Sequence, residues 1–181
     1  MSESPSGKWL IVAYDLPNEP SKLRVKVWRN FKKNGALYPS VSLCILPDTQ
    51  QVRKWINQVR PDIYKNGSVL VLSANPLEKM DGEQLIKMFQ EERKKQYEEL
   101  YEECREFLDE IKENLGKKKI TYEETDELEQ ALQALEKWYN DIRQKGYGRP
   151  EDMAKVDRVM KECRKQLANF SEKAQPKKIN D

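Results

Sequence analysis

A regular seam of apolar residues near the C-terminus constrains the fold more than any other feature of this 181-residue chain. Successive positions in the seam are separated by 3, 4, 3, 4 and 3 residues, which is the a/d spacing of helices that pack side by side. Its members are Met153, Val156, Met160, Cys163, Leu167 and Phe170. The spacing predicts a helix from Pro150 to about Ala174 that packs against partner helices through this stripe.

Two further helices with the same kind of apolar stripe are predicted upstream. One spans about 83–115 and the other about 121–145, with Thr121 and Glu124 forming a capping box at the start of the second. Short glycine-containing breaks separate the helices. Because short links make neighbouring helices antiparallel, we expect residues 83–174 to form a three-helix antiparallel coiled-coil bundle.

The first 76 residues alternate between short apolar runs and amphipathic helices. Strands are predicted near 9–14, 36–38, 40–46 and 68–72, and helices over 22–34 and from Asp48 to about Pro61. This order of elements is the ferredoxin-like split βαβ arrangement. We therefore expect an α+β protein with a ferredoxin-like domain over 8–76, in which the first and third strands are central. Residues 1–7 and 175–181 are expected to be flexible termini.

Single residues predict where these elements begin and end. Ser21 is the expected N-cap of the first helix, and Gly35 is its expected C-terminal glycine. Pro39 is expected to separate the two short middle strands. Asp48 is the expected N-cap of the second helix, and Pro61 is expected to end or kink that helix.

Charge is divided unevenly along the chain. Residues 1–80 contain 12 Lys and Arg against 6 Asp and Glu, whereas residues 81–181 contain 21 against 25. The first predicted helix is the most basic segment, because 21–35 contains no acid. On a helical wheel Lys22, Lys26, Arg29 and Lys33 fall within about 60° of one another, with Arg24 and Lys32 at the flanks. Such a stripe suits a row of phosphates, although an ordinary solvated face has the same composition.

Few groups in this sequence suggest catalysis. There is no histidine, which is the usual general base and the commonest zinc ligand. Asp15 follows the first strand and could hold a divalent metal, but with no second acid nearby it is better interpreted as a turn residue. Trp28 is interpreted as an aromatic at the edge of the core. The segment 93–95 is interpreted as an exposed, ion-paired helix face. No cofactor is expected.

The three cysteines fit neither a disulfide framework nor a zinc pattern. Cys44 lies in a predicted strand, whereas Cys104 and Cys163 lie on the apolar stripes of two helices. Counting along the predicted helices places both at the same level, so their thiols should lie within about 10 Å in one core layer. Buried cysteines behave as small hydrophobes, yet this proximity makes Cys104 and Cys163 a candidate redox pair.

Targeting signals are not evident. No run approaches the roughly 20 apolar residues that span a bilayer. The polar segment Met1–Gly7 lacks the apolar core of a signal peptide, so we expect a cytoplasmic protein without membrane contact.

Several motifs together match a known pattern. They are Trp9–Pro17, Glu19–Ser21, Arg24–Arg29, Gly35–Tyr38 and Leu43–Pro47, followed by Phe89–Arg93, Tyr97–Cys104 and Glu162–Cys163. From about Lys8 to Glu172 the chain resembles the N-terminal domain of the ChrB-type chromate-resistance regulator family. Residues 9–75 are also similar to the small ferredoxin-like CRISPR adaptation proteins and to the related domain of the phenylacetate-catabolism repressor. In the CRISPR proteins the functional carboxylate ends the first strand, the place of Asp15 here.

The resemblance implies a link to chromate or oxidative-stress resistance. Together with the basic helix, it leads us to expect a non-enzymatic regulatory protein that binds nucleic acid, DNA being favoured, as a homodimer whose geometry the helical arm sets. Phosphate contacts are expected from Lys22, Arg24, Lys26, Arg29 and Lys33. The alternatives are a metal-dependent nuclease using Asp15 from two subunits, and a structural adaptor whose coiled coil binds a protein.

Overall fold

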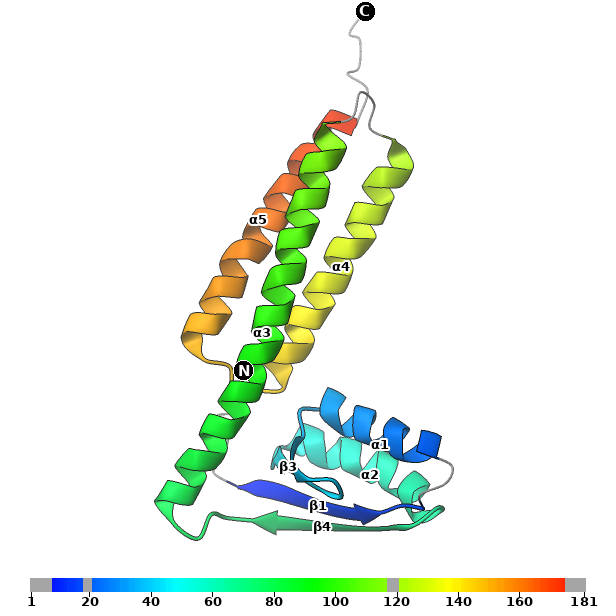
Figure 1. Cartoon of the computed structure of the whole chain (residues 1–181), viewed down its shortest axis with the longest axis vertical. Coiled ribbons are helices and arrows are strands. Elements are labelled where there is room, and N and C mark those ends of the chain that lie inside the picture. Colours follow the sequence, from blue (N-terminus) through cyan, green and yellow to red (C-terminus); the bar gives the residue numbers. More distant parts are fainter. Residues whose placement is uncertain (1–7, 18–20, 117–120, 175–181) are drawn as a thin grey trace, which may run out of the picture. The chain divides into compact units, whose positions relative to one another are not determined.

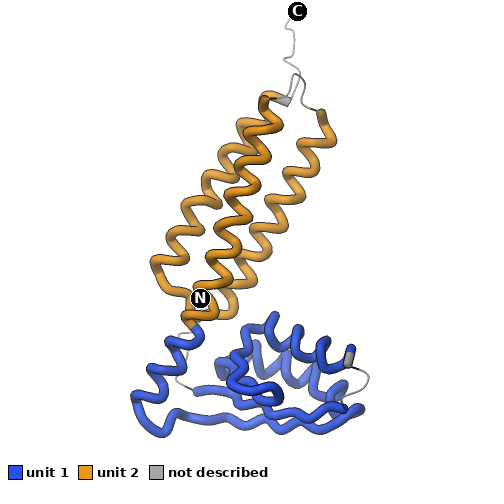
Figure 2. The backbone as a smooth tube through the Cα atoms, viewed as in Figure 1, with its two compact units in different colours: residues 1–89 blue, residues 90–181 orange. Residues whose placement is uncertain are grey.

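The protein contains two compact units, shown in different colours in Figure 2. The computed structural model describes residues 8–17, 21–116 and 121–174. Unit 1 comprises residues 1–89 and unit 2 comprises residues 90–181. The termini that we expected to be flexible lie outside the described residues. The division falls within a long helix and not within a separate linker.

Unit 1 contains a four-stranded antiparallel sheet with two helices on one of its faces (Figure 1). Its elements are β1 (Trp9–Asp15), α1 (Ser21–Lys33), β2 (Leu37–Ser40), β3 (Leu43–Pro47), α2 (Gln50–Tyr64) and β4 (Ser68–Ala74). The elements follow one another in the predicted order. The strands are arranged β2-β3-β1-β4, so β1 and β3 are the inner pair.

The core of unit 1 lies between the sheet and the two helices. Alternate residues of β1, among them Leu10, Val12 and Tyr14, point into it because successive side chains of a strand face opposite ways. Phe31 of α1 is buried among them, with its ring centroid 5.7 Å from that of Tyr14 and 4.9 Å from that of Trp55. This packing directs one side of α1 to the sheet and the opposite side to solvent.

The other face of the sheet presents apolar side chains. One row crosses all four strands at directly paired positions and consists of Leu72, Ile11, Ile45 and Leu37. Leu70 and Leu72 on β4 are 55% and 50% exposed. Trp9 on the same face is covered, because its ring stacks on Phe89 with centroids 5.0 Å apart. The open apolar part of this face therefore lies on β4, whereas Leu37 at the other end of the row is buried.

The end of α1 is built as the sequence predicts. Gly35 has a φ of +88°, a conformation that favours glycine. Its N–H donates to the Lys32 carbonyl at 3.0 Å, and the Ala36 N–H donates to the Phe31 carbonyl at 3.0 Å. These two bonds form a Schellman motif. At the other end the helix includes Ser21 as its first residue, so Ser21 does not precede the helix as predicted.

The prediction for Pro39 is wrong, and Pro61 does not end its helix. Pro39 lies within β2 and does not separate two strands; β2 is an edge strand, where a residue without an N–H is tolerated. Pro61 lies inside α2, which continues to Tyr64, and the Lys65 N–H still donates to the Pro61 carbonyl at 3.1 Å. Burial of Ile63 in the core of unit 1 offsets the cost of the proline.

The cap of α2 is Thr49 and not Asp48. The Thr49 hydroxyl accepts a hydrogen bond from the Val52 N–H at 3.2 Å. The Asp48 carboxylate is bound elsewhere, because the Arg53 guanidinium donates two hydrogen bonds to it and the Ser73 hydroxyl donates a third at 2.8 Å. These donors, Arg53 foremost, hold the pKa of Asp48 below its usual value.

Three helices follow the sheet: α3 (Lys79–Leu115), α4 (Tyr122–Gln144) and α5 (Pro150–Ala174). α3 begins before the predicted residue 83, so residues 79–82 are also helical. In unit 2 the three helices lie side by side and share one apolar core (Figure 1). The predicted seam of α5 is buried there, with Met153 at its margin. The stripes predicted from heptad spacing are therefore confirmed.

The ends of the helices in unit 2 also follow local sequence signals. The Glu124 N–H donates to the Thr121 hydroxyl at 3.2 Å, and the Thr121 N–H donates to the Glu124 carboxylate at 2.9 Å, which confirms the predicted capping box. Pro150 is the first residue of α5, a position where its missing N–H costs nothing. The break after Leu115 includes residues 117–120, which lie outside the described residues.

Candidate nucleic-acid interface

The solvent-facing side of α1 carries the predicted basic stripe. Lys22, Lys26, Arg29 and Lys33 are all exposed. The helix contains no acidic residue, and within the described part of the chain none of the four side chains forms a salt bridge. Like charges one turn apart repel by a few tenths of a kcal/mol per pair. α1 therefore keeps an uncompensated positive face, which favours an anionic partner.

The two flanking cations of α1 lie differently. Arg24 is half-buried and near the Tyr14 phenol; burial raises the pKa of Tyr14, and the Arg24 charge partly opposes that rise. The Lys32 ammonium lies 5.9 Å from the centroid of the Tyr38 ring, within cation–π range. Four of the five residues predicted to contact phosphate therefore share one face of α1. Arg24, the fifth, lies apart from them.

Trp28 lies on α1, about 100° around the helix from Arg29 of the stripe. It is 44% exposed and its neighbour Val25 is 43% exposed, and Trp28 is not among the residues that pack on the core of unit 1. More than half of the surface of Trp28 is covered, which is compatible with an aromatic at the edge of the core. α1 contacts the sheet through Val27 and Phe31, and one residue turns about 100° around the helix, so Trp28 is carried away from that contact.

Most cations in and just after the neighbouring helix α2 contact a carboxylate or an aromatic ring. Arg53 binds the carboxylate described above. The Arg60 guanidinium lies 5.3 Å from the centroid of the Tyr64 ring, and the Lys65 ammonium lies 3.6 Å from the Asp62 carboxylate. In unit 1 the concentration of unpaired positive charge is therefore a property of α1.

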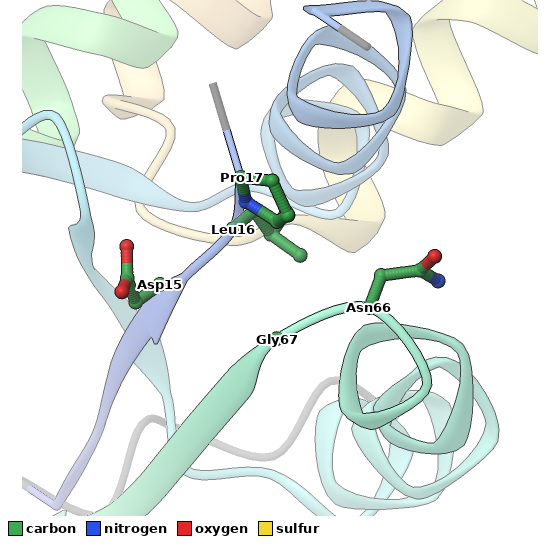
Figure 3. Close-up of a pocket in the computed structure, with 5 residues that line it drawn as sticks. All are labelled: Asp15, Leu16, Pro17, Asn66 and Gly67. Carbon is green, nitrogen blue, oxygen red and sulfur yellow. The ribbon is translucent and has the colours of Figure 1, made fainter. Parts of the chain in front are cut away.

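Asp15 ends β1 and lines an open surface hollow of about 390 Å³ (Figure 3). The other lining residues are Leu16, Pro17, Asn66 and Gly67. Gly67 is needed there, because a Cβ at this position would lie 2.0 Å from the Asp15 carbonyl oxygen. Figure 3 shows the Asp15 carboxylate and the Asn66 amide pointing away from each other. The polar groups of this hollow do not converge on a common point.

The residues at this hollow make an incomplete metal site. Asp15 is the single carboxylate among the described residues that line it. Divalent magnesium and calcium take several oxygen ligands. Across the described ranges no group of three or more Cys, Asp or Glu side chains is placed to hold a metal ion. A metal centre at Asp15 would need further oxygen ligands besides the described residues of this hollow.

Cys104 and Cys163 come together in unit 2. The Cys163 thiol lies 3.5 Å from the Cys104 carbonyl oxygen, and both residues belong to the same core, as counting along the predicted helices indicated. Cys44 is buried separately in the core of unit 1, where desolvation raises its pKa to about 12.

One buried cation was misjudged from the sequence. Arg93 was expected on an exposed ion-paired face, but it is 1% exposed, and burial lowers its pKa to about 10. The available signal was its spacing: Arg93 lies four residues after Phe89 and four before Tyr97, both of which are buried. Its position on the apolar stripe outweighed its charge.

The chain thus consists of a small α/β unit with a basic helical face, followed by a helical unit with a continuous core. A comparison with protein families then identifies it. The chain matches the model described as Protein ChrB, N-terminal, over residues 24–179, and it therefore belongs to that family. The family associates the chain with chromate resistance and with a regulatory role. No curated protein matches the sequence. No described helix is long and apolar enough to cross a membrane.

Proposed function

We propose that this chain is a regulatory protein that binds nucleic acid, DNA being favoured, through the exposed face of α1. The observation that carries the proposal is the acid-free stripe formed by Lys22, Lys26, Arg29 and Lys33. From its first to its last residue the stripe spans about 16 Å, a length over which duplex DNA carries about ten phosphates. Each phosphate that a cation neutralises releases counterions, which supplies binding free energy without base recognition.

A salt titration of binding tests this proposal. We would measure the affinity of the full chain for duplex and single-stranded DNA between 50 and 200 mM salt, and compare it with that of a Lys26→Gln/Arg29→Gln variant. If both side chains contact phosphates, the slope of log K against log salt should fall by about 1.8 on duplex DNA, at about 0.9 per contact.

The matched control removes two cations that have acidic partners. Lys94 and Lys112 lie on α3, 3.8 Å from Glu98 and 2.6 Å from Asp109. A Lys94→Gln/Lys112→Gln variant loses the same net charge and should keep the parent slope. Equal loss of slope in both double variants would show that net charge alone attracts the polymer, and the assignment to α1 would be abandoned.

We also propose that the chain acts as a homodimer. The support is the face of the sheet opposite its helices, where β4 presents the half-exposed Leu70 and Leu72 beside the partly buried Ile11. A second copy is the occupant we favour, because the apolar side chains of two such faces can cover each other. We infer a ferredoxin-like arrangement for this unit from its element and strand order, and an antiparallel bundle for unit 2 from its shared core.

Light scattering at several concentrations tests the dimer. Leu72→Asp should shift the mass towards the monomer, while far-UV circular dichroism stays native because the side chain is half-exposed. Leu77→Asp, at a side chain that is almost fully exposed outside the strands, is the control and should leave the mass unchanged. A monomeric parent protein would refute the dimer.

The alternative function is metal-dependent hydrolysis with one Asp15 from each of two subunits. What favours it is the position of Asp15, exposed at the end of a strand beside an open hollow. It ranks second because the described residues of the hollow offer one carboxylate. If the chain neither binds nor cleaves nucleic acid, the remaining reading is an adaptor that binds protein through unit 2.

A further inference from the structure

Unit 2 contains a cluster of three sulfur atoms that the nucleic-acid proposal does not use. Cys104 lies on α3, and Met160 and Cys163 lie one turn apart on α5; all three are buried. The Cys104 thiol lies 3.3 Å from the Met160 sulfur, and the Cys163 thiol lies 3.5 Å from the Cys104 carbonyl oxygen. Two thiols separated by 59 residues in sequence are thus neighbours across a helix interface.

The two thiols are not equivalent. The Cys163 thiol lowers the pKa of Cys104, whereas the Cys104 thiol and burial raise the pKa of Cys163. The core that contains Cys44 has no second cysteine. Cys44 therefore shows how a buried thiol without a neighbouring thiol reacts.

We propose that Cys104 and Cys163 form an oxidant-responsive dithiol that closes to a disulfide between α3 and α5. With hydrogen peroxide as the two-electron oxidant, the Cys104 sulfur attacks one peroxide oxygen and the O–O bond breaks. This step gives a sulfenic acid on Cys104 and one water. The Cys163 sulfur then attacks the Cys104 sulfur, the S–O bond breaks, and the hydroxide leaves as a second water with the Cys163 proton.

Burial determines how this reaction proceeds. Both sulfurs lie inside the core, so peroxide reaches them when unit 2 opens locally. Once Cys104 is oxidised, Cys163 is its nearest thiol, and closure competes well with further oxidation. The disulfide would fix α3 to α5 and would raise the stability of unit 2 by restricting its unfolded chain. This inference is independent of nucleic-acid binding, because its readouts are thiol chemistry and helix stability.

Thiol mapping on the full reduced chain tests the proposal. The protein is treated with hydrogen peroxide, unfolded, alkylated with iodoacetamide and digested. We expect a linked Cys104–Cys163 peptide pair two hydrogens lighter than the sum of its parts, with Cys44 fully alkylated. The thermal midpoint followed at 222 nm should rise by about 10 °C on oxidation and return with dithiothreitol, since closing a loop of this length stabilises strongly.

Two variants and a denaturant series make the test decisive. Cys44→Ala should still form the linked pair, and Cys104→Ala should not. Low concentrations of urea that increase local opening should speed the reaction. The proposal is overturned if all three cysteines stay alkylatable even in such urea, if Cys104 and Cys163 proceed to sulfinic acids without linking, or if linkage joins Cys44 instead. The mapping uses the unaltered chain, so it does not depend on any variant folding.

Discussion

The helix α1 and the helices of unit 2 are both rich in charge, but they arrange it in opposite ways. In unit 2 acids and bases alternate and pair, for example Arg164 with Glu136 at 2.6 Å and Lys94 with Glu98 at 3.8 Å. On α1 the exposed face has one sign and no acidic partner within the helix. Alternating charges keep the surface of a helix in water while its core supplies the stability. A face of one sign costs stability through repulsion between like charges, and therefore indicates an anionic partner.

The largest effects are expected from substitutions in the two cores, which should affect nucleic-acid binding differently. Phe170→Ala empties a fully buried site in unit 2 and should cost about 3–5 kcal/mol of stability, measured by urea unfolding at 222 nm, without weakening nucleic-acid binding. Phe31→Ala, at an equally buried site beneath α1, should abolish binding by unfolding unit 1. If Phe170→Ala abolished binding as well, the units would not be separable in function.

The next effect concerns the turn that precedes β4. Gly67→Ala would force a Cβ to within 2.0 Å of the Asp15 carbonyl oxygen, a backbone atom that cannot move aside easily. We expect unit 1 to lose about 2–3 kcal/mol of stability in denaturant unfolding. Ser68→Ala, one residue later and exposed, is the control and should change the stability by less than about 0.5 kcal/mol.

A smaller effect is expected at Asp15. Asp15→Asn should leave the affinity for DNA unchanged or raise it by less than about threefold, because one negative charge is removed from the basic unit. The parent protein should not cleave DNA with magnesium or manganese present, as followed on gels. Robust metal-dependent cleavage that disappears in Asp15→Asn would place the nuclease function first.

The smallest effects should differ in sign. Lys26→Gln on α1 relieves repulsion from Lys22 and should stabilise unit 1 by about 0.2–0.5 kcal/mol. Arg164→Gln removes a partner of Glu136 and should destabilise unit 2 by less than about 1 kcal/mol. Precise thermal melts of both variants can resolve these changes. A destabilising Lys26→Gln would mean that Lys26 has a structural partner and is not held for binding.

Much of the fold follows from local patterns in the sequence. The heptad seam predicted α5 from its first residue onward, the capping box located the start of α4, and Gly35 marked the end of α1. Each of these signals depends on contacts within one helix or on a repeated apolar stripe. Such contacts are determined by spacing along the chain, so the sequence alone was sufficient.

The errors arose where distant residues compete for the same group. Asp48 was available as a cap, but Arg53 of α2 and Ser73 of β4 bind its carboxylate, so Thr49 caps the helix. Pro61 was expected to end or kink α2, but the helix continues to Tyr64, and the burial of Ile63 offsets the lost hydrogen bond. These outcomes depend on tertiary contacts that spacing does not encode.

The candidate site was also predicted only in part from the sequence. Helical geometry alone was enough to place four cations on one face of α1. It could not show that Arg24 turns toward Tyr14, or that Trp28 is exposed, because both depend on how α1 is rotated on the sheet. The rotation is set by Phe31 and the residues it meets in the core.

The position of Pro39 has a consequence for how this protein behaves when crowded or partly unfolded. The edge strand β2 is only four residues long and carries this proline, so it is a poor template for a strand of another molecule. The opposite edge, β4, has seven residues, no proline and no lysine, and two half-exposed leucines. Aggregation by strand addition should therefore begin at β4, and a single lysine placed on that edge would be the simplest way to suppress it.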